Sequence, residues 1–110
     1  MTVELLELTL FVTDVDATAR FYKAAGLHLF CVDEPGYPRH YDGELGFQLF
    51  PADVRHSVSH VHMGFVVDDL AKSVQQLALE GARWTCRFPN FVTTHDPDGN
   101  KINLAQRRMK

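Results

Sequence analysis

LFVTDV at residues 10–15 and FVVDDL at residues 65–70 are two copies of one pattern, separated by 55 positions. Each copy is an apolar stretch that ends at an aspartate. Moving outward from the two copies, the same offset places Gly26 on Gly81 and Gln48 on Asn103. A repeat of about 50 residues indicates one supersecondary unit that occurs twice. Two such units can enclose a pocket between them, so we expect functional side chains at positions that correspond between the halves.

The residues around each aspartate predict a strand followed by a helix. One face of the predicted strand is apolar and consists of Leu6, Leu8, Leu10 and Val12 in the first half and of Val61, Met63, Phe65 and Val67 in the second. This alternation is typical of a β-strand. Asp14 and Asp69 then stand where a helix N-cap belongs, because an aspartate side chain can accept hydrogen bonds from free backbone N–H groups. Gly26 and Gly81 stand where each helix should end.

Three short strands are predicted after each helix. They span 27–32, 37–41 and 45–50 in the first half, and 83–88, 91–95 and 101–105 in the second. A turn is expected at 42–44, and the sequence DPDGN at 96–100 is a strong turn signal. We therefore expect a single domain over 1–110, with module one at 1–50, a linker at 51–59 and module two at 60–110. Each module has the order β-α-β-β-β, which makes an α+β fold.

Composition excludes several classes of function. The chain has 110 residues, 45% of them hydrophobic, and a formal net charge of -3 without a basic stripe, so we expect no nucleic-acid partner. No apolar stretch approaches the roughly 20 residues that span a membrane. The first residues lack a secretory signal. Cys31 and Cys86 occupy equivalent places, which predicts two buried, unbridged thiols and a cytoplasmic protein.

The duplicated unit resembles the vicinal oxygen chelate superfamily, which includes glyoxalase I, fosfomycin-resistance proteins, extradiol dioxygenases and bleomycin-resistance proteins. The resemblance rests on residues 10–14, Phe21-Tyr22 and Gly26-Leu27 in the first half, and on residues 65–70 and the turn at 96–100 in the second. It implies that the two modules form a curved mixed sheet around a cavity. It also implies that metal ligands, where present, lie early in the first strand and in the last strand of each module.

Strand alternation identifies the residues at these places in this chain. Glu7 and His62 lie opposite the helix-packed face of the first strands, and Gln48 and Asn103 do so in the last strands. The candidate metal ligands are therefore Glu7, Gln48, His62 and Asn103, which would suit one Zn²⁺, Ni²⁺, Mn²⁺ or Fe ion. Glu7 and His62 are also the candidate catalytic residues. Thr9, Phe11, Gln48, Phe50 and Asn103 are the candidate ligand-binding residues.

Two functions remain open at this point. Asn103 stands where the family usually has a glutamate, and an amide neither transfers protons nor binds metal strongly. This argues against glyoxalase I activity and favours a protein that binds a small organic molecule between the modules without a catalytic metal. The alternative is a divalent-metal-dependent lyase, isomerase or dioxygenase of the same superfamily. Whether the chain is an enzyme is left undecided by the residues.

The remaining expectations concern assembly and histidines. The family pairs its modules within one chain or swaps them between two, and a homodimer is expected here. In a swapped dimer, Glu7 and Gln48 would meet His62 and Asn103 of the partner chain. His40 and His95 lie 55 positions apart and are expected at equivalent places beside the turns, and His60 is expected to end the linker in solvent.

Overall fold

Residues 2–108 are described by the computed structural model, except for the side chain of Arg87. The first module contains β1 (Leu8–Val12), α1 (Val15–Ala25), β2 (Leu29–Val32), β3 (His40–Gly43) and β4 (Phe47–Pro51). The second contains β5 (His62–Val67), α2 (Leu70–Leu79), β6 (Trp84–Phe88), β7 (Phe91–His95) and β8 (Lys101–Gln106). The predicted β-α-β-β-β order is confirmed in both modules.

Each module forms its own four-stranded mixed sheet, with the orders β1-β4-β3-β2 and β5-β8-β7-β6. The first strand of each module pairs in parallel with the last, and the other neighbours are antiparallel. The parallel pairing requires a crossover, and helix α1 or α2 supplies it. The two modules are thus the same structural unit, as the repeat predicts.

The predicted aspartate caps are confirmed at both helices. The Asp14 carboxylate accepts a hydrogen bond from the Ala17 backbone N–H at 3.0 Å, and the Asp69 carboxylate accepts one from the Lys72 N–H at 3.1 Å. Helix α1 ends at Ala25 and is capped by Gly26, whose φ of 126° glycine adopts more readily than other residues. Each helix therefore begins directly after its strand and returns the chain along one face of the sheet.

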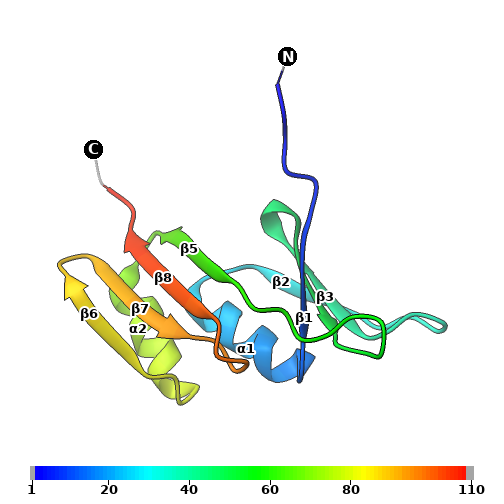
Figure 1. Ribbon diagram of the computed structural model, residues 1–110. Helices are drawn as coiled ribbons and strands as arrows, with labels where there is room; N and C mark the ends of the chain where they lie inside the picture. Colours follow the sequence, from blue (N-terminus) through cyan, green and yellow to red (C-terminus); the bar gives the residue numbers. More distant parts are fainter. Residues whose placement is uncertain (1, 109–110) are drawn as a thin grey trace.

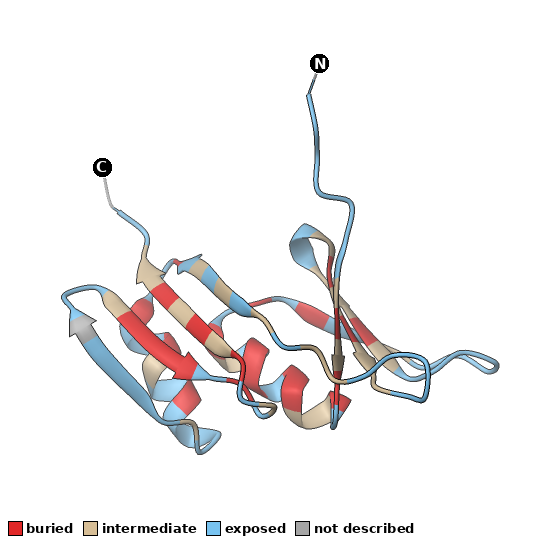
Figure 2. Ribbon diagram, viewed as in Figure 1, coloured by how far each residue is buried: buried red, intermediate tan, exposed pale blue. Residues whose placement is uncertain are grey.

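The core lies between the helices and one face of the two sheets. Both helices cover the same side (Figure 1), and buried and more exposed residues alternate along β8 (Figure 2). The side chains most completely buried there include Leu10, Tyr22, Leu49, Leu77, Ile102 and Leu104. Helix α2 is joined to α1 by a hydrogen bond from the Ser73 hydroxyl to the Ala25 carbonyl at 2.7 Å. The other face of each sheet carries no helix.

The predicted turn at 42–44 is wrong, and so is the predicted equivalence of His40 and His95. Strand β3 continues to Gly43, and a 3-10 turn follows at Glu44–Gly46, with positive φ at Leu45 and Gly46. As a result Asp42 pairs with Gln48 in the way that Thr93 pairs with Asn103. The connection before β4 is four residues shorter than the one that contains DPDGN before β8. Before this connection, corresponding residues of the two modules are therefore four positions closer in sequence than the repeat predicts, and His40 corresponds to Phe91 and not to His95.

The two cysteines are unbridged, but the prediction that they are buried is wrong. Cys31 and Cys86 are both free and exposed. Each lies in an edge strand, β2 or β6, whose outer side has no neighbouring strand in its sheet. Within residues 2–108, neither helix has the length and apolar character needed to cross a membrane.

Candidate functional site

The sheet faces that point away from the helices carry the predicted site residues. Strand pairing sets side chains of one face in rows across each sheet. We define the first open face as Thr9, Phe11, Phe30, His40, Asp42, Gln48 and Phe50. We define the second open face as His62, Gly64, Val66, Phe91, Thr93, Lys101, Asn103 and Ala105. The predicted ligand-binding residues all belong to these two faces.

On the first open face, the Gln48 amide is held in one orientation. The Thr9 hydroxyl donates a hydrogen bond to Gln48 Oε1 at 2.9 Å, and Gln48 Nε2 donates one to Asp42 Oδ1 at 3.1 Å. An ionised carboxylate only accepts hydrogen bonds, so the amide nitrogen must face Asp42 and the oxygen must face Thr9. One lone pair of the amide oxygen is already used by the threonine.

An aromatic row adjoins this amide. The His40 ring stacks on Phe50, with centroids 4.1 Å apart, and the His56 ring stacks on Phe11 at 4.2 Å. Phe11 and Phe50 lie between the two histidines, with centroids 6.3 Å apart. His40 Nε2 also lies 3.5 Å from Asp42 Oδ1. The first open face therefore combines a flat apolar wall with an ordered polar line.

Neither His40 nor His56 is among the site residues predicted from the sequence. His56 comes from the linker, where the sequence has no periodicity that could indicate which way a side chain points. His40 is expected beside the turn, at the end of the predicted strand 37–41, whereas the structure places it at the start of β3. The pairing of Asp42 with Gln48 places His40, two residues before Asp42 in the same strand, on the first open face.

On the second open face, Asn103 is held in a corresponding way. The Thr93 hydroxyl donates to Asn103 Oδ1 at 2.7 Å, and Asn103 Nδ2 lies 3.0 Å from His62 Nε2. With the amide assigned this way round from its hydrogen bonds, its oxygen faces Thr93 and its nitrogen faces His62. Both modules thus place an amide beside a threonine hydroxyl in the middle of the open face.

The four predicted metal ligands fall into two separate groups. His62 and Asn103 contact each other, whereas Gln48 contacts Thr9 and Asp42 on the other sheet. Glu7 precedes β1 and is exposed. Within the part of the chain that the structure describes, no hydrogen bond joins the two groups. The catalytic roles of Glu7 and His62 stay predictions.

This donor set does not fit a divalent metal within one chain. Both amide oxygens already accept a hydrogen bond from a threonine, and Nε2 of His62 faces the Asn103 amide nitrogen. An amide oxygen is in any case a weak ligand for zinc or nickel compared with carboxylate, imidazole or thiolate. Among residues 2–108, no three His, Cys, Asp or Glu side chains converge in a way that could hold a metal ion.

The position of β3, which carries His40 and Asp42, is fixed from the helix side. The Tyr41 hydroxyl donates to Asp16 Oδ1 at 2.7 Å, and Arg39 Nη2 donates to the same oxygen at 3.0 Å. These hydrogen bonds hold the pKa of the Asp16 carboxyl below its usual range, the Tyr41 contact most strongly. Because Asp16 belongs to α1, the helix and β3 are tied together.

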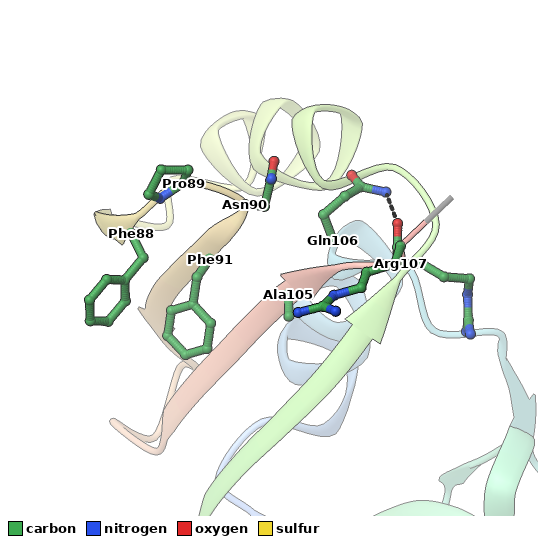
Figure 3. Close-up of a pocket in the computed structure, with 8 residues that line it drawn as sticks. Phe88, Pro89, Asn90, Phe91, Ala105, Gln106 and Arg107 are labelled. Carbon is green, nitrogen blue, oxygen red and sulfur yellow. Dashed lines mark hydrogen bonds between the residues drawn. The ribbon is translucent and has the colours of Figure 1, made fainter. Parts of the chain in front are cut away.

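A pocket of about 590 Å³ extends the second open face beyond the predicted residues. Its lining, drawn in Figure 3, consists of Phe88, Pro89, Asn90, Phe91, Ala105, Gln106, Arg107 and Arg108. Phe91 and Ala105 belong to the second open face, directly beside the row of Thr93 and Asn103. A Pro-Asn pair between two phenylalanines was the available sequence signal for this turn.

Comparison with known proteins supports the fold strongly. The family model described as a glyoxalase-like domain matches residues 7–105. Among solved structures, the fosfomycin resistance protein FosX from Mesorhizobium loti is similar over 99% of this chain and 95% of its own, at 15% identity and a TM-score of 0.71. No curated protein sequence matches the chain.

Two further structures show the same fold. An antibiotic-binding protein from a Streptomyces species is 20% identical, with a TM-score of 0.66, over 97% of this chain and 98% of its own. Glyoxalase I from Leishmania major is 19% identical, with a TM-score of 0.70, over 96% of this chain and 87% of its own. At these identities the likeness concerns the fold, and the predicted architecture is confirmed.

Proposed function

The chain belongs to the glyoxalase-like domain family of the vicinal oxygen chelate superfamily, and we propose that it binds a small organic molecule without a catalytic metal. The observation that carries this proposal is the state of the two central amides. Gln48 and Asn103 are each oriented by a threonine hydroxyl, so each presents a fixed polar group on a sheet face. A few fixed polar groups among aromatic side chains are what a small-molecule site requires.

The hydrogen bonds already formed by Gln48, Asn103 and His62 favour this function over that of a metal-dependent lyase, isomerase or dioxygenase. A metal ion would find only the second lone pair of each amide oxygen, a weak ligand, and His62 would have to give up its contact with the Asn103 amide. An organic ligand needs no such change. It can accept or donate hydrogen bonds at the free positions of Gln48 and Asn103 while its apolar part packs on Phe11 and Phe50.

We further propose that the cavity is completed by a second copy of the chain. Each open face lies on its own sheet, and a single face covers only one side of a ligand. The N-terminal segment also extends away from the body of the protein (Figure 1) and exposes Val3, Leu5 and Leu6 at 92%, 69% and 85%. Such a run of exposed apolar side chains is typical of an interface. In the dimer, the first open face of one copy would face the second open face of the other.

Binding is tested by titrating the uniformly ¹⁵N-labelled protein with a library of small organic compounds in buffer that contains EDTA. We expect compounds that shift amide signals on both open faces, and weaker binding in Gln48→Ala and Asn103→Ala. Gln75→Ala is the matched control, because Gln75 is exposed on α2. Compounds that bind only after Mn²⁺, Ni²⁺ or Zn²⁺ is added, or only on the helix side, would contradict the proposal.

A further inference from the structure

The pocket beside the second open face has an aromatic wall built by a tight turn. The Phe88 and Phe91 rings meet edge to face, with centroids 6.0 Å apart, and Phe88 is exposed (Figure 3). Asn90 has a φ of 63°, in the left-handed region that asparagine tolerates better than most residues. This turn brings the two phenylalanines onto the same side, where flat apolar surface is open to a ligand.

Gln106 is a fixed part of the pocket lining, because both its backbone N–H and its side-chain amide form hydrogen bonds within the protein. Its backbone N–H donates to the Asn90 carbonyl at 2.9 Å, which ties the turn to the end of β8. Its side chain accepts from the Leu70 N–H at 2.9 Å and donates to the Asp68 carbonyl at 2.7 Å. The Gln106 amide is therefore committed to the start of α2 and leaves ligand recognition to other groups.

The pocket also carries positive charge that its surroundings do not neutralise. Arg107 Nε donates to Asp68 Oδ1 at 2.7 Å, which balances one guanidinium with one carboxylate. Arg108 lines the same pocket and forms no ion pair with any residue in the range 2–108. The adjoining open face adds Lys101 and includes no acidic side chain. One unpaired guanidinium thus lines the same pocket as the exposed ring of Phe88 and the half-buried ring of Phe91.

We propose that this pocket binds an aromatic carboxylate. The ring packs against Phe88 and Phe91, and the carboxylate receives charge-assisted hydrogen bonds from Arg108. A guanidinium matches the geometry of a carboxylate better than an ammonium does. This inference rests on the proposed function, because it assigns the chemical class of the molecule that the open faces bind.

The test compares two probes that differ only in charge, 2-naphthoate and its neutral amide, 2-naphthamide. Each is titrated into the ¹⁵N-labelled full chain, and the dissociation constant is taken from amide shifts. We expect 2-naphthoate to bind about tenfold more tightly, because hydrogen bonds to a charged partner are stronger than neutral ones. The largest shifts are expected at the backbone amides of Asn90, Phe91 and Gln106.

Variants separate the charge from the aromatic wall. Arg108→Gln should reduce 2-naphthoate binding about tenfold, to the level of 2-naphthamide, and Phe88→Ala should weaken both probes. Arg20→Gln is the control, because Arg20 lies on α1 and pairs with Glu80. Equal affinity for the two probes, no binding of 2-naphthoate, or no effect of Arg108→Gln would overturn the inference. The proposed function would survive those results if neutral library compounds still bound at Gln48 and Asn103.

Discussion

The Tyr22 hydroxyl donates a buried hydrogen bond of 2.7 Å to the Asp96 carboxylate, which joins helix α1 of the first module to the turn before β8 of the second. The same carboxylate also accepts from the backbone N–H groups of Asp98 and Asn100. Burial, and then this hydrogen bond, raise the pKa of Tyr22 far above its usual value, so the hydroxyl remains a donor. The modules are thus joined on the helix side, and the open faces stay available for binding.

Replacing Tyr22 by phenylalanine should weaken this joint. The change removes a donor to a buried carboxylate and should lower the free energy of unfolding by about 1.5–3 kcal/mol, measured by urea denaturation. Tyr37→Phe is the control, because Tyr37 is exposed, and its stability should stay within about 0.5 kcal/mol of the unmodified protein. Equal stability of the two variants would show that the hydrogen bond does not join the modules.

Gly46 fixes the segment that leads to Glu7. Its φ is 74°, and a Cβ atom there would overlap the Leu6 carbonyl oxygen. Gly46→Ala should therefore cost more stability than Gly99→Ala, where φ is 87° but nothing lies within 4 Å. Gly99→Ala should cost only the conformational strain, roughly 1–2 kcal/mol. The comparison is made by urea denaturation, and equal costs would contradict the close approach of Leu6 to Gly46.

Asp16 should make stability depend on acid pH. Its folded-state pKa is lowered, so its stabilising contribution is fully present above the pKa of the unfolded chain and is lost as pH falls through the lower folded value. The stability difference between the unmodified protein and Asp16→Asn should therefore shrink below about pH 4. Urea denaturation at several pH values measures this. A difference that is constant with pH would refute it, and Glu34→Gln serves as an exposed control.

The exposed N-terminal leucines should hold the dimer together. Leu5→Glu with Leu6→Glu should shift the protein toward monomer in sedimentation velocity, because burial of a charge at an interface is costly. Leu79→Glu is a matched control, since Leu79 is 77% exposed on α2, on the helix side. A double variant that sediments like the control and the unmodified protein would remove the apolar segment from the interface.

The repeat and its caps could be predicted because they depend on local chemistry. Alternation around residues 10–15 and 65–70 gave the strands, and Asp14 and Asp69 gave the helix starts, all of which the structure confirms. The alternation also placed Gln48 and Asn103 on the faces that carry no helix. Such features follow from a period of two or from one capping side chain, and need no knowledge of tertiary contacts.

Other features depend on tertiary geometry that one sequence does not reveal. The 3-10 turn at Glu44–Gly46 requires a positive φ at Leu45, a conformation that leucine rarely adopts. The stacking of His56 on Phe11 depends on the path of the linker. The separation of Gln48 from His62 depends on how the two sheets are placed, because each module forms a sheet from its own four strands.

The shared cavity requires that the first open face of one copy meets the second open face of another, and cross-linking measures this contact. Gln48→Cys and Asn103→Cys are made in separate chains that also carry Cys31→Ser and Cys86→Ser, so that each has one thiol. The two chains are co-expressed and treated with a short bismaleimide. We expect a cross-linked heterodimer, and little product from either variant alone. Cross-linking that occurs only within a single chain carrying both new cysteines would contradict it.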